Sequence, residues 1–136
     1  MLGDDRQLAG YGLISAADMG SVARMVAADP RRRGDFADEA SYTNASVESL
    51  VADAQNHAAA WNWAARAGRM AGRPVLVLTS DDGLATTGEA AAAAVVAAGG
   101  PRPTMIHMAT DHSFNDHRVA LAAAVLRWLQ TSFSSR

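Results

Sequence analysis

A short, uninterrupted apolar run at residues 74–79 constrains this chain more than any other stretch, and Asp81 and Asp82 follow it after a single serine. The run consists mostly of Val and Leu without polar alternation, which is typical of a strand covered on both faces in a parallel sheet. Two other runs, 10–17 and 104–108, also have the length of buried strands, and helical patterns separate the three. We therefore predict an α/β fold with about three parallel strands and covering helices.

The composition narrows the possible classes of function. The formal net charge is −2, and acidic residues follow the basic run 31–33, so we predict no nucleic-acid partner. The absence of cysteine excludes thiolate catalysis, disulfides and Cys-based zinc sites, and it fits a reducing compartment. All 12 basic residues are Arg, which excludes lysine chemistry. No run reaches the roughly 18 apolar residues of a membrane span, and the first residues do not resemble a secretory signal, so we expect a soluble, cytoplasmic protein without a membrane partner.

Two regions of the chain have a strong helical pattern of apolar residues. From about residue 44 to 68, apolar residues recur at steps of three and four, which predicts one long helix, the longest of the chain. This helix lies in a region, 35–70, that could form a cap with Trp61 and Trp63 or could simply cover the sheet. The last helix is apolar on two faces, so we expect it to be buried on more than one side.

A carboxylate after one strand and a histidine after the next form two thirds of a nucleophilic triad in the chain order Ser, Asp, His. Parallel strands bring their carboxyl ends to the same edge of a sheet, where open α/β folds place their chemistry. Asp82 would orient the imidazole of His112 through Nδ1–H, and Nε2 would take the proton of an attacking hydroxyl. Asp81 remains the alternative acid, because the sequence does not show which neighbouring carboxylate points inward.

The segment 73–82 and the loop 110–118, which contains Asp-His-Ser-Phe, resemble the last two strands of the α/β-hydrolase fold. The similarity is to dienelactone-hydrolase and prolyl-oligopeptidase-like esterases and peptidases. The run 10–17 then resembles the strand that follows the nucleophile helix of that family, so the resemblance covers nearly the whole chain. It implies a partial α/β-hydrolase fold in a single C-terminal segment, 1–136. It also implies a serine hydrolase acting on a small-molecule ester, a thioester or a peptide.

The chain departs from this family at the nucleophile. The family's strained elbow requires Gly-x-Ser-x-Gly, and neither Ser15, Ser21, Ser80 nor Ser113 has glycine at both flanking positions. We therefore expect the C-terminal part of a truncated or two-chain hydrolase, whose missing N-terminal half supplies the serine in cis or in trans. Alone, the chain should be inactive. The strand at 10–17 would then have an open edge, which predicts self-association.

Two other classes of function stay open. Asp111-His112 and Asp116-His117 form a repeated pair near Asp81 and Asp82, and such ligands suit zinc, iron or manganese. Their five-residue spacing does not place two ligands on one helical face, so we predict no metal and no cofactor, and we interpret Asp116 as a helix N-cap. The remaining alternative is a non-catalytic α/β fragment or interaction module.

Overall fold

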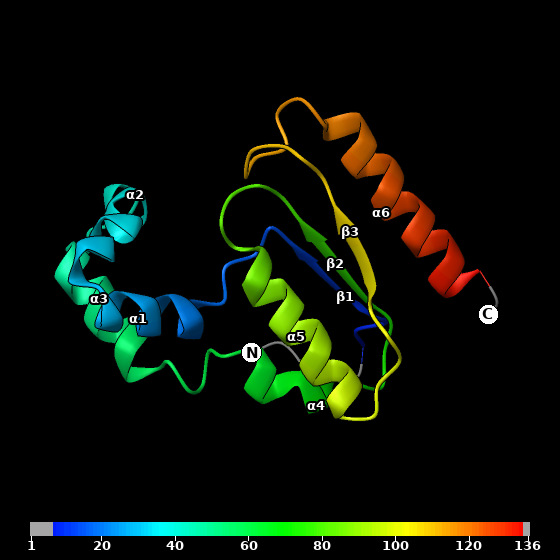
Figure 1. Cartoon of the computed structure of the whole chain (residues 1–136), viewed down its shortest axis with the longest axis horizontal. Coiled ribbons are helices and arrows are strands. Elements are labelled where there is room, and N and C mark those ends of the chain that lie inside the picture. Colours follow the sequence, from blue (N-terminus) through cyan, green and yellow to red (C-terminus); the bar gives the residue numbers. More distant parts are fainter. Residues whose placement is uncertain (1–6, 135–136) are drawn as a thin grey trace. The chain divides into compact units, whose positions relative to one another are not determined.

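The computed structural model describes residues 7–134 (Figure 1). Contacts divide the chain into two compact units. The sheet unit contains residues 7–16 and 66–134, and the helical unit contains residues 17–65.

Three parallel strands form one open sheet in the order β1-β2-β3 (Figure 1). The strands are β1 (Tyr11–Ile14), β2 (Val75–Thr79) and β3 (Thr104–His107), so the predicted parallel α/β arrangement is confirmed. β1 is shorter than the apolar run 10–17, because Ser15 has a φ of 37°, which ends the extended conformation. β1 pairs with β2 alone among the described strands, and its other edge is open.

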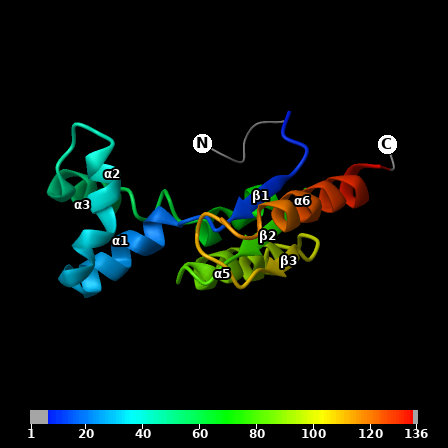
Figure 2. The same cartoon turned by 90° about the horizontal axis from the view of Figure 1, so that it is seen from above.

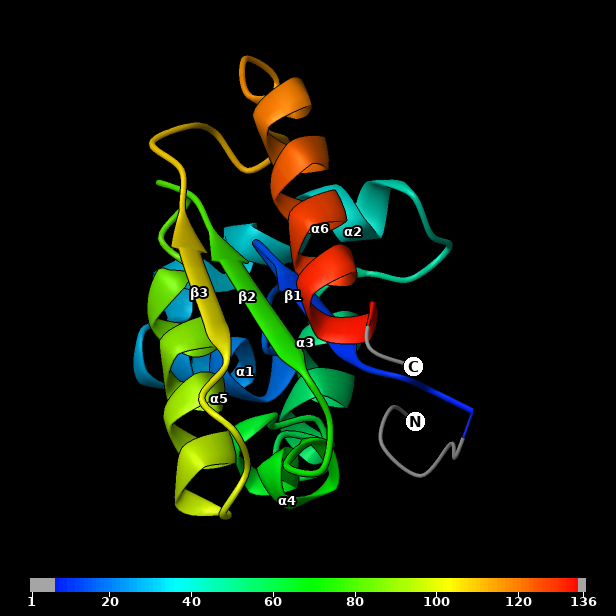
Figure 3. The same ribbon diagram turned by 90° about the vertical axis from the view of Figure 1, so that its right-hand side faces the viewer.

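Helices cover both faces of β2, and all five of its residues are buried, as the run of Val and Leu predicts. Helix α5 (Ala85–Ala97) lies on one face and helix α6 (Arg118–Phe133) on the other (Figure 3). The short helix α4 (Ala67–Met70) packs beside α5. The close approach of α5 depends on Gly88, since a Cβ there would lie 2.8 Å from the side chain of Val77.

Helix α6 is less buried than its two apolar faces predict. Trp128 is its one buried residue, and it lies with Phe133 beside Gly10 at the start of β1. Val119, Leu126 and Leu129 are 85%, 58% and 41% exposed. The expectation of burial on more than one side is therefore wrong for the described chain, because a three-stranded sheet offers this helix one surface only. None of the described helices is long and apolar enough to cross a membrane.

The helical unit has a core of its own, to which α1 (Met19–Ala28), the 3-10 helix η1 (Pro30–Phe36) and α3 (Val47–Asn56) contribute (Figure 2). The short helix α2 (Ala37–Ser41) follows η1. Buried apolar side chains at helical spacing on α1 and α3 face each other, as amphipathic helices require. The buried members of this core are Val22, Ala23, Val26, Phe36, Val51 and Ala54.

The single long helix predicted from about residue 44 to 68 is wrong. Helix α3 ends at Asn56, and the next segment is irregular up to the 3-10 helix η2 (Ala64–Arg66). His57 stacks on Trp61 with ring centroids 4.9 Å apart. Further along, the amide of Trp63 and the side chain of Asn62 donate hydrogen bonds to the buried carboxylate of Asp18. These tertiary contacts replace the helical hydrogen bonds that the apolar spacing favours, and α6 is the longest helix described.

Candidate functional site

The structure brings together the two residues that the sequence analysis assigns as acid and base. Asp82 follows β2 and His112 follows the neighbouring β3, so both lie at the carboxyl edge of the sheet. Nδ1 of His112 lies 2.8 Å from Oδ2 of Asp82. The side chain of Asp82 is only 7% exposed, whereas that of His112 is 62% exposed. The pair therefore has a shielded carboxylate and an accessible imidazole.

Asp81, the alternative acid, has a different partner. Its Oδ1 lies 3.3 Å from Nε2 of His107, the last residue of β3. Nδ1 of the same ring is 3.0 Å from Oγ1 of Thr79. The two adjacent carboxylates thus point toward different histidines, and Gly83, with a φ of 80°, allows the tight turn that follows them. Of the two aspartates, Asp82 is the one that meets His112.

Hydrogen bonds to the carboxylate of Asp82 lower its pKa and favour its ionised form. Burial alone would raise the pKa of Asp82, but the hydrogen bonds from the His112 ring and the Leu84 amide outweigh it, so that the pKa lies below its ordinary value. These two donors lie 2.8 and 2.9 Å from the carboxylate oxygens. An ionised carboxylate only accepts hydrogen bonds. Nδ1 of His112 must therefore carry the proton, which leaves Nε2 as the basic atom of the neutral ring.

Hydrogen bonds to the turn after β2 and within the segment from 108 to 117 hold the loop that carries His112. The carbonyl of Thr110 accepts a hydrogen bond from the amide of Asp81 at 3.0 Å, which connects this loop to the turn after β2. The carboxylate of Asp111 accepts from the backbone and the side chain of Asn115, at 3.0 and 2.8 Å. Phe114 is buried, 3% exposed, and has a φ of 53°, which is uncommon for a non-glycine residue. His112 is therefore held by an ordered loop.

Asp116 is not the N-cap of the last helix, contrary to the sequence interpretation. Helix α6 begins at Arg118, its N-cap is His117, and no side chain caps it. The carboxylate of Asp116 instead accepts a hydrogen bond from the hydroxyl of Thr110 and lies 2.8 Å from Nδ1 of His117. The hydrogen bond from Thr110, followed by the closeness of the His117 ring, lowers the pKa of Asp116 to about 2. Because its carboxylate contacts Thr110 and His117, Asp116 does not cap the first turn of α6.

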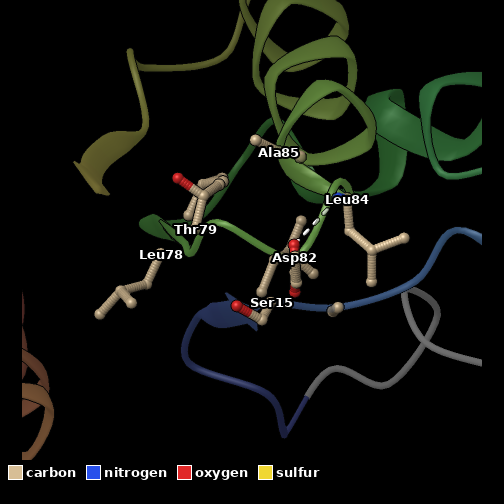
Figure 4. A pocket seen from close by; sticks show the side chains of 10 residues that line it. Ser15, Leu78, Thr79, Asp82, Leu84 and Ala85 are labelled. Carbon is tan, nitrogen blue, oxygen red and sulfur yellow. Dashed lines mark hydrogen bonds between the residues drawn. The ribbon is translucent and has the colours of Figure 1, made fainter. Parts of the chain in front are cut away.

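A small cavity lies beside Asp82, between the end of β1 and the start of α5 (Figure 4). Leu13, Ser15, Thr79 and Leu84 are among its lining residues. Its volume, about 10 Å³, is that of roughly one water molecule. The cavity is therefore too small to hold an ester or peptide substrate.

Two serines at this edge make a buried contact that the sequence patterns do not predict. The hydroxyls of Ser15 and Ser80 lie 2.7 Å apart, and the two residues are 5% and 1% exposed. The sequence offers both serines only as candidate nucleophiles, which their neighbouring residues exclude. Their positions in the sequence could have indicated this contact. Ser80 directly precedes the acidic pair, and Ser15 directly follows the neighbouring strand.

A metal site at this edge would require several of its aspartates and histidines to converge on one point. Asp111 and Asp116 bind within their own loop, and Asp81 and Asp82 contact different histidines. Among the side chains that the structure describes, no three His, Cys, Asp or Glu residues converge as metal ligands would.

Comparison of the chain with protein-family models, curated proteins and solved structures finds no match. The α/β-hydrolase fragment expected from the sequence of the strands and of the loops that carry Asp82 and His112 therefore stays a prediction.

Proposed function

We propose that this chain provides the acid and the base of a nucleophilic triad that hydrolyses ester, thioester or peptide bonds. One observation carries the proposal, namely the hydrogen bond from Nδ1 of His112 to Oδ2 of Asp82. It joins a shielded, ionised carboxylate to an exposed imidazole at the carboxyl edge of a parallel sheet. This is the arrangement that general-base activation of a hydroxyl requires.

In this proposal, each residue has a separate chemical task. Nε2 of His112 takes the proton as the hydroxyl attacks the carbonyl carbon, and it later returns a proton to the leaving group. Asp82 holds the ring in the Nδ1–H tautomer and stabilises the imidazolium that forms between these steps. The nucleophile is a serine of a segment outside these 136 residues, because no serine here has the flanking glycines of the elbow.

The same outside segment would complete the substrate pocket. The cavity beside Asp82 has room for about one water molecule, and a substrate needs a pocket of several hundred cubic ångströms. The oxyanion hole would also come from that segment, since donors must surround the carbonyl oxygen under attack. The chain alone is therefore expected to be inactive.

Burst-phase hydrolysis of a p-nitrophenyl ester tests this function. The chain is assayed alone, and also mixed with or fused to an upstream α/β-hydrolase half that carries a Gly-x-Ser-x-Gly serine. We expect activity only in the combined form, and we expect its loss in His112→Ala. The matched control is His107→Ala, which removes another histidine of the same edge that contacts Asp81. Equal activity of both variants, or no activity in any combination, would reject the proposal.

A non-catalytic interaction module is the second candidate. It is favoured by the exposed apolar side chains of α6, which are Val119, Leu126 and Leu129. Such a group of side chains is typical of a surface that contacts another protein. Under this alternative, His112→Ala would leave association with a partner unchanged, whereas Leu126→Asp would weaken it.

A further inference from the structure

His112 lies in a short turn that hydrogen bonds close on both sides of it. The amide of Phe114 donates to the carbonyl of Asp111 at 3.1 Å, so residues 111–114 form a hydrogen-bonded β-turn with His112 as its second residue. The carboxylate of Asp111 accepts two further hydrogen bonds from Asn115. The backbone amide donates to Oδ1 at 3.0 Å, and the side chain donates to Oδ2 at 2.8 Å. We call these two hydrogen bonds the Asp111–Asn115 clasp, and it spans the candidate base.

The chemistry of the side chains fixes the direction of each hydrogen bond at the clasp. The amide and the side chain of Asn115 hold the pKa of Asp111 below its ordinary value, and an ionised carboxylate can only accept. Nδ2 of Asn115 therefore faces Asp111. Oδ1 of the same side chain accepts from the guanidinium of Arg118 at 3.1 Å, which can only donate. The clasp is thus connected to the first residue of α6.

Both ends of the turn are held by the sheet unit. Just before the turn, the carbonyl of Thr110 accepts a hydrogen bond from the amide of Asp81 at 3.0 Å. At its end, Phe114 is 3% exposed and has a φ of 53°, a conformation that persists only where surrounding contacts maintain it. The side chain of His112 itself is 62% exposed, so packing restrains the ring little. The direction of the ring therefore depends on the backbone of the turn.

We propose that Asp111 and Asn115 are positioning residues for the candidate base. Their clasp fixes the backbone of the turn, so that Nδ1 of His112 meets Oδ2 of Asp82. Without the clasp, the exposed ring would spend less time in this hydrogen bond, and general-base catalysis depends on that geometry. The inference rests on the proposed function only in assigning a catalytic use to the oriented pair.

Two single substitutions disrupt the clasp with almost no change in side-chain size. In Asp111→Asn, one acceptor oxygen becomes a donor, so a hydrogen bond of the clasp or the one from Arg118 must be lost. In Asn115→Asp, two carboxylates face each other and repel. The double variant, Asp111→Asn with Asn115→Asp, exchanges the two side chains. It again places an amide opposite a carboxylate and leaves one carboxylate oxygen to accept from Arg118.

The test measures the tautomer of the His112 ring by its ¹⁵N chemical shifts at alkaline pH, in the intact chain and without substrate. The native ring should be mainly in the Nδ1–H form, and Asp82→Ala gives the reference spectrum for full loss of the acceptor. We expect each single variant to move the His112 shifts toward that reference, and the double variant to return them to their native values. Ser113→Ala is the matched control and should leave the shifts unchanged, because this exposed serine lies in the same turn.

Urea unfolding of the same variants separates positioning from stability. Single variants that unfold more easily but retain the native His112 shifts would show a merely structural role and would overturn the proposal. Shifts that stay displaced in the double variant would also overturn it, because the exchange restores every hydrogen bond of the clasp. Displacement in both single variants with recovery in the double variant would support it.

This experiment is independent of the hydrolase assay. Displaced His112 shifts in the single variants, restored by the exchange, would support the positioning role even if no ester is hydrolysed. Conversely, activity of the combined enzyme together with native His112 shifts in Asp111→Asn would support the proposed function and reject the positioning role.

Discussion

Oδ2 of Asp82 receives its hydrogen bond from Nδ1 of His112 at 2.8 Å, although the two residues are 30 positions apart in the chain. The carboxylate is shielded and the imidazole is exposed. Shielding strengthens the electrostatic interaction between the two groups, because less water screens it. Exposure leaves the basic nitrogen of the ring accessible to a hydroxyl, which is what a proton-transfer pair requires.

Replacement of Asp82 should reduce catalysis far more than replacement of the adjacent Asp81. In the enzyme combined with an upstream half, we expect Asp82→Asn to lower kcat by roughly 10⁴-fold, because the amide favours the wrong tautomer of His112. Asp81→Asn is the matched control and should have little effect, since Asp81 pairs with His107. Steady-state kinetics of both variants checks this prediction, and a larger loss in Asp81→Asn would contradict it.

The folded protein should lose stability in acid through its paired carboxylates. The pKa of Asp116 is about 2 and that of Asp82 is also lowered, whereas an unfolded aspartate titrates near 3.9. The unfolded chain therefore binds more protons in this range. Stability from these groups is fully present above about pH 5 and is lost as the pH falls toward about 2.

Thr110→Val tests the contribution of Asp116 to this acid sensitivity. The variant removes the hydroxyl that contributes most to lowering the pKa of Asp116, so the pKa should rise toward its ordinary value. Carboxyl ¹³C titration measures the shift directly. Urea unfolding at neutral and acid pH should show a smaller loss of stability in the variant than in the native chain. An unchanged titration midpoint would contradict the assignment of Thr110 as the donor.

Two leucines of the sheet unit should differ strongly in their contribution to folding. Leu78 on β2 is 0% exposed and Leu126 on α6 is 58% exposed. We expect Leu78→Ala to lower the free energy of unfolding by about 2–5 kcal/mol, because it leaves a cavity in the core. Leu126→Ala should change it by less than about 0.5 kcal/mol. Urea denaturation of both variants measures the difference, and a comparable loss in Leu126→Ala would mean that α6 is covered in solution.

The open edge of β1 should promote self-association. Ile14 is 39% exposed on this strand, and unpaired strand edges pair readily with other chains. We expect Ile14→Arg to reduce the associated fraction in sedimentation velocity, because a charge at the edge opposes pairing. Val119→Arg places the same charge on α6 and is the control. A monomeric native chain at high concentration would rule out this association, and a stronger effect of Val119→Arg would locate it on the helix.

The carboxylate of Asp18 should stabilise the helical unit. It caps α1 by accepting from the Ser21 amide at 3.0 Å, and it also accepts from Asn62 and Trp63 while being 2% exposed. Asp18→Ala should cost roughly 2–3 kcal/mol, from the lost cap and the unsatisfied donors. Hydrogen exchange of the Trp63 amide should become faster. Asp53→Ala, at a carboxylate that is 58% exposed, is the control and should leave that exchange unchanged.

Several parts of the fold could be predicted because they depend on local pattern. Apolar runs of strand length indicated β1, β2 and β3, and the lack of polar alternation indicated burial of β2 on both faces. The placement of Asp82 and His112 at one edge followed from the parallel connection of neighbouring strands. The helix expected from residue 44 to 68 failed, because apolar spacing does not reveal contacts such as those of Asn62 and Trp63 with Asp18.

The sequence by itself thus determined the class of the fold, the approximate strands and the two loops that hold the candidate acid and base. The tertiary structure alone decided which aspartate faces His112, that the hydroxyls of Ser15 and Ser80 meet, and that α6 is mostly exposed. This difference arises because hydrophobic periodicity is encoded along the chain and can be found in the sequence. The direction of a side chain after a turn instead depends on backbone dihedrals and on hydrogen-bond partners far away in the sequence.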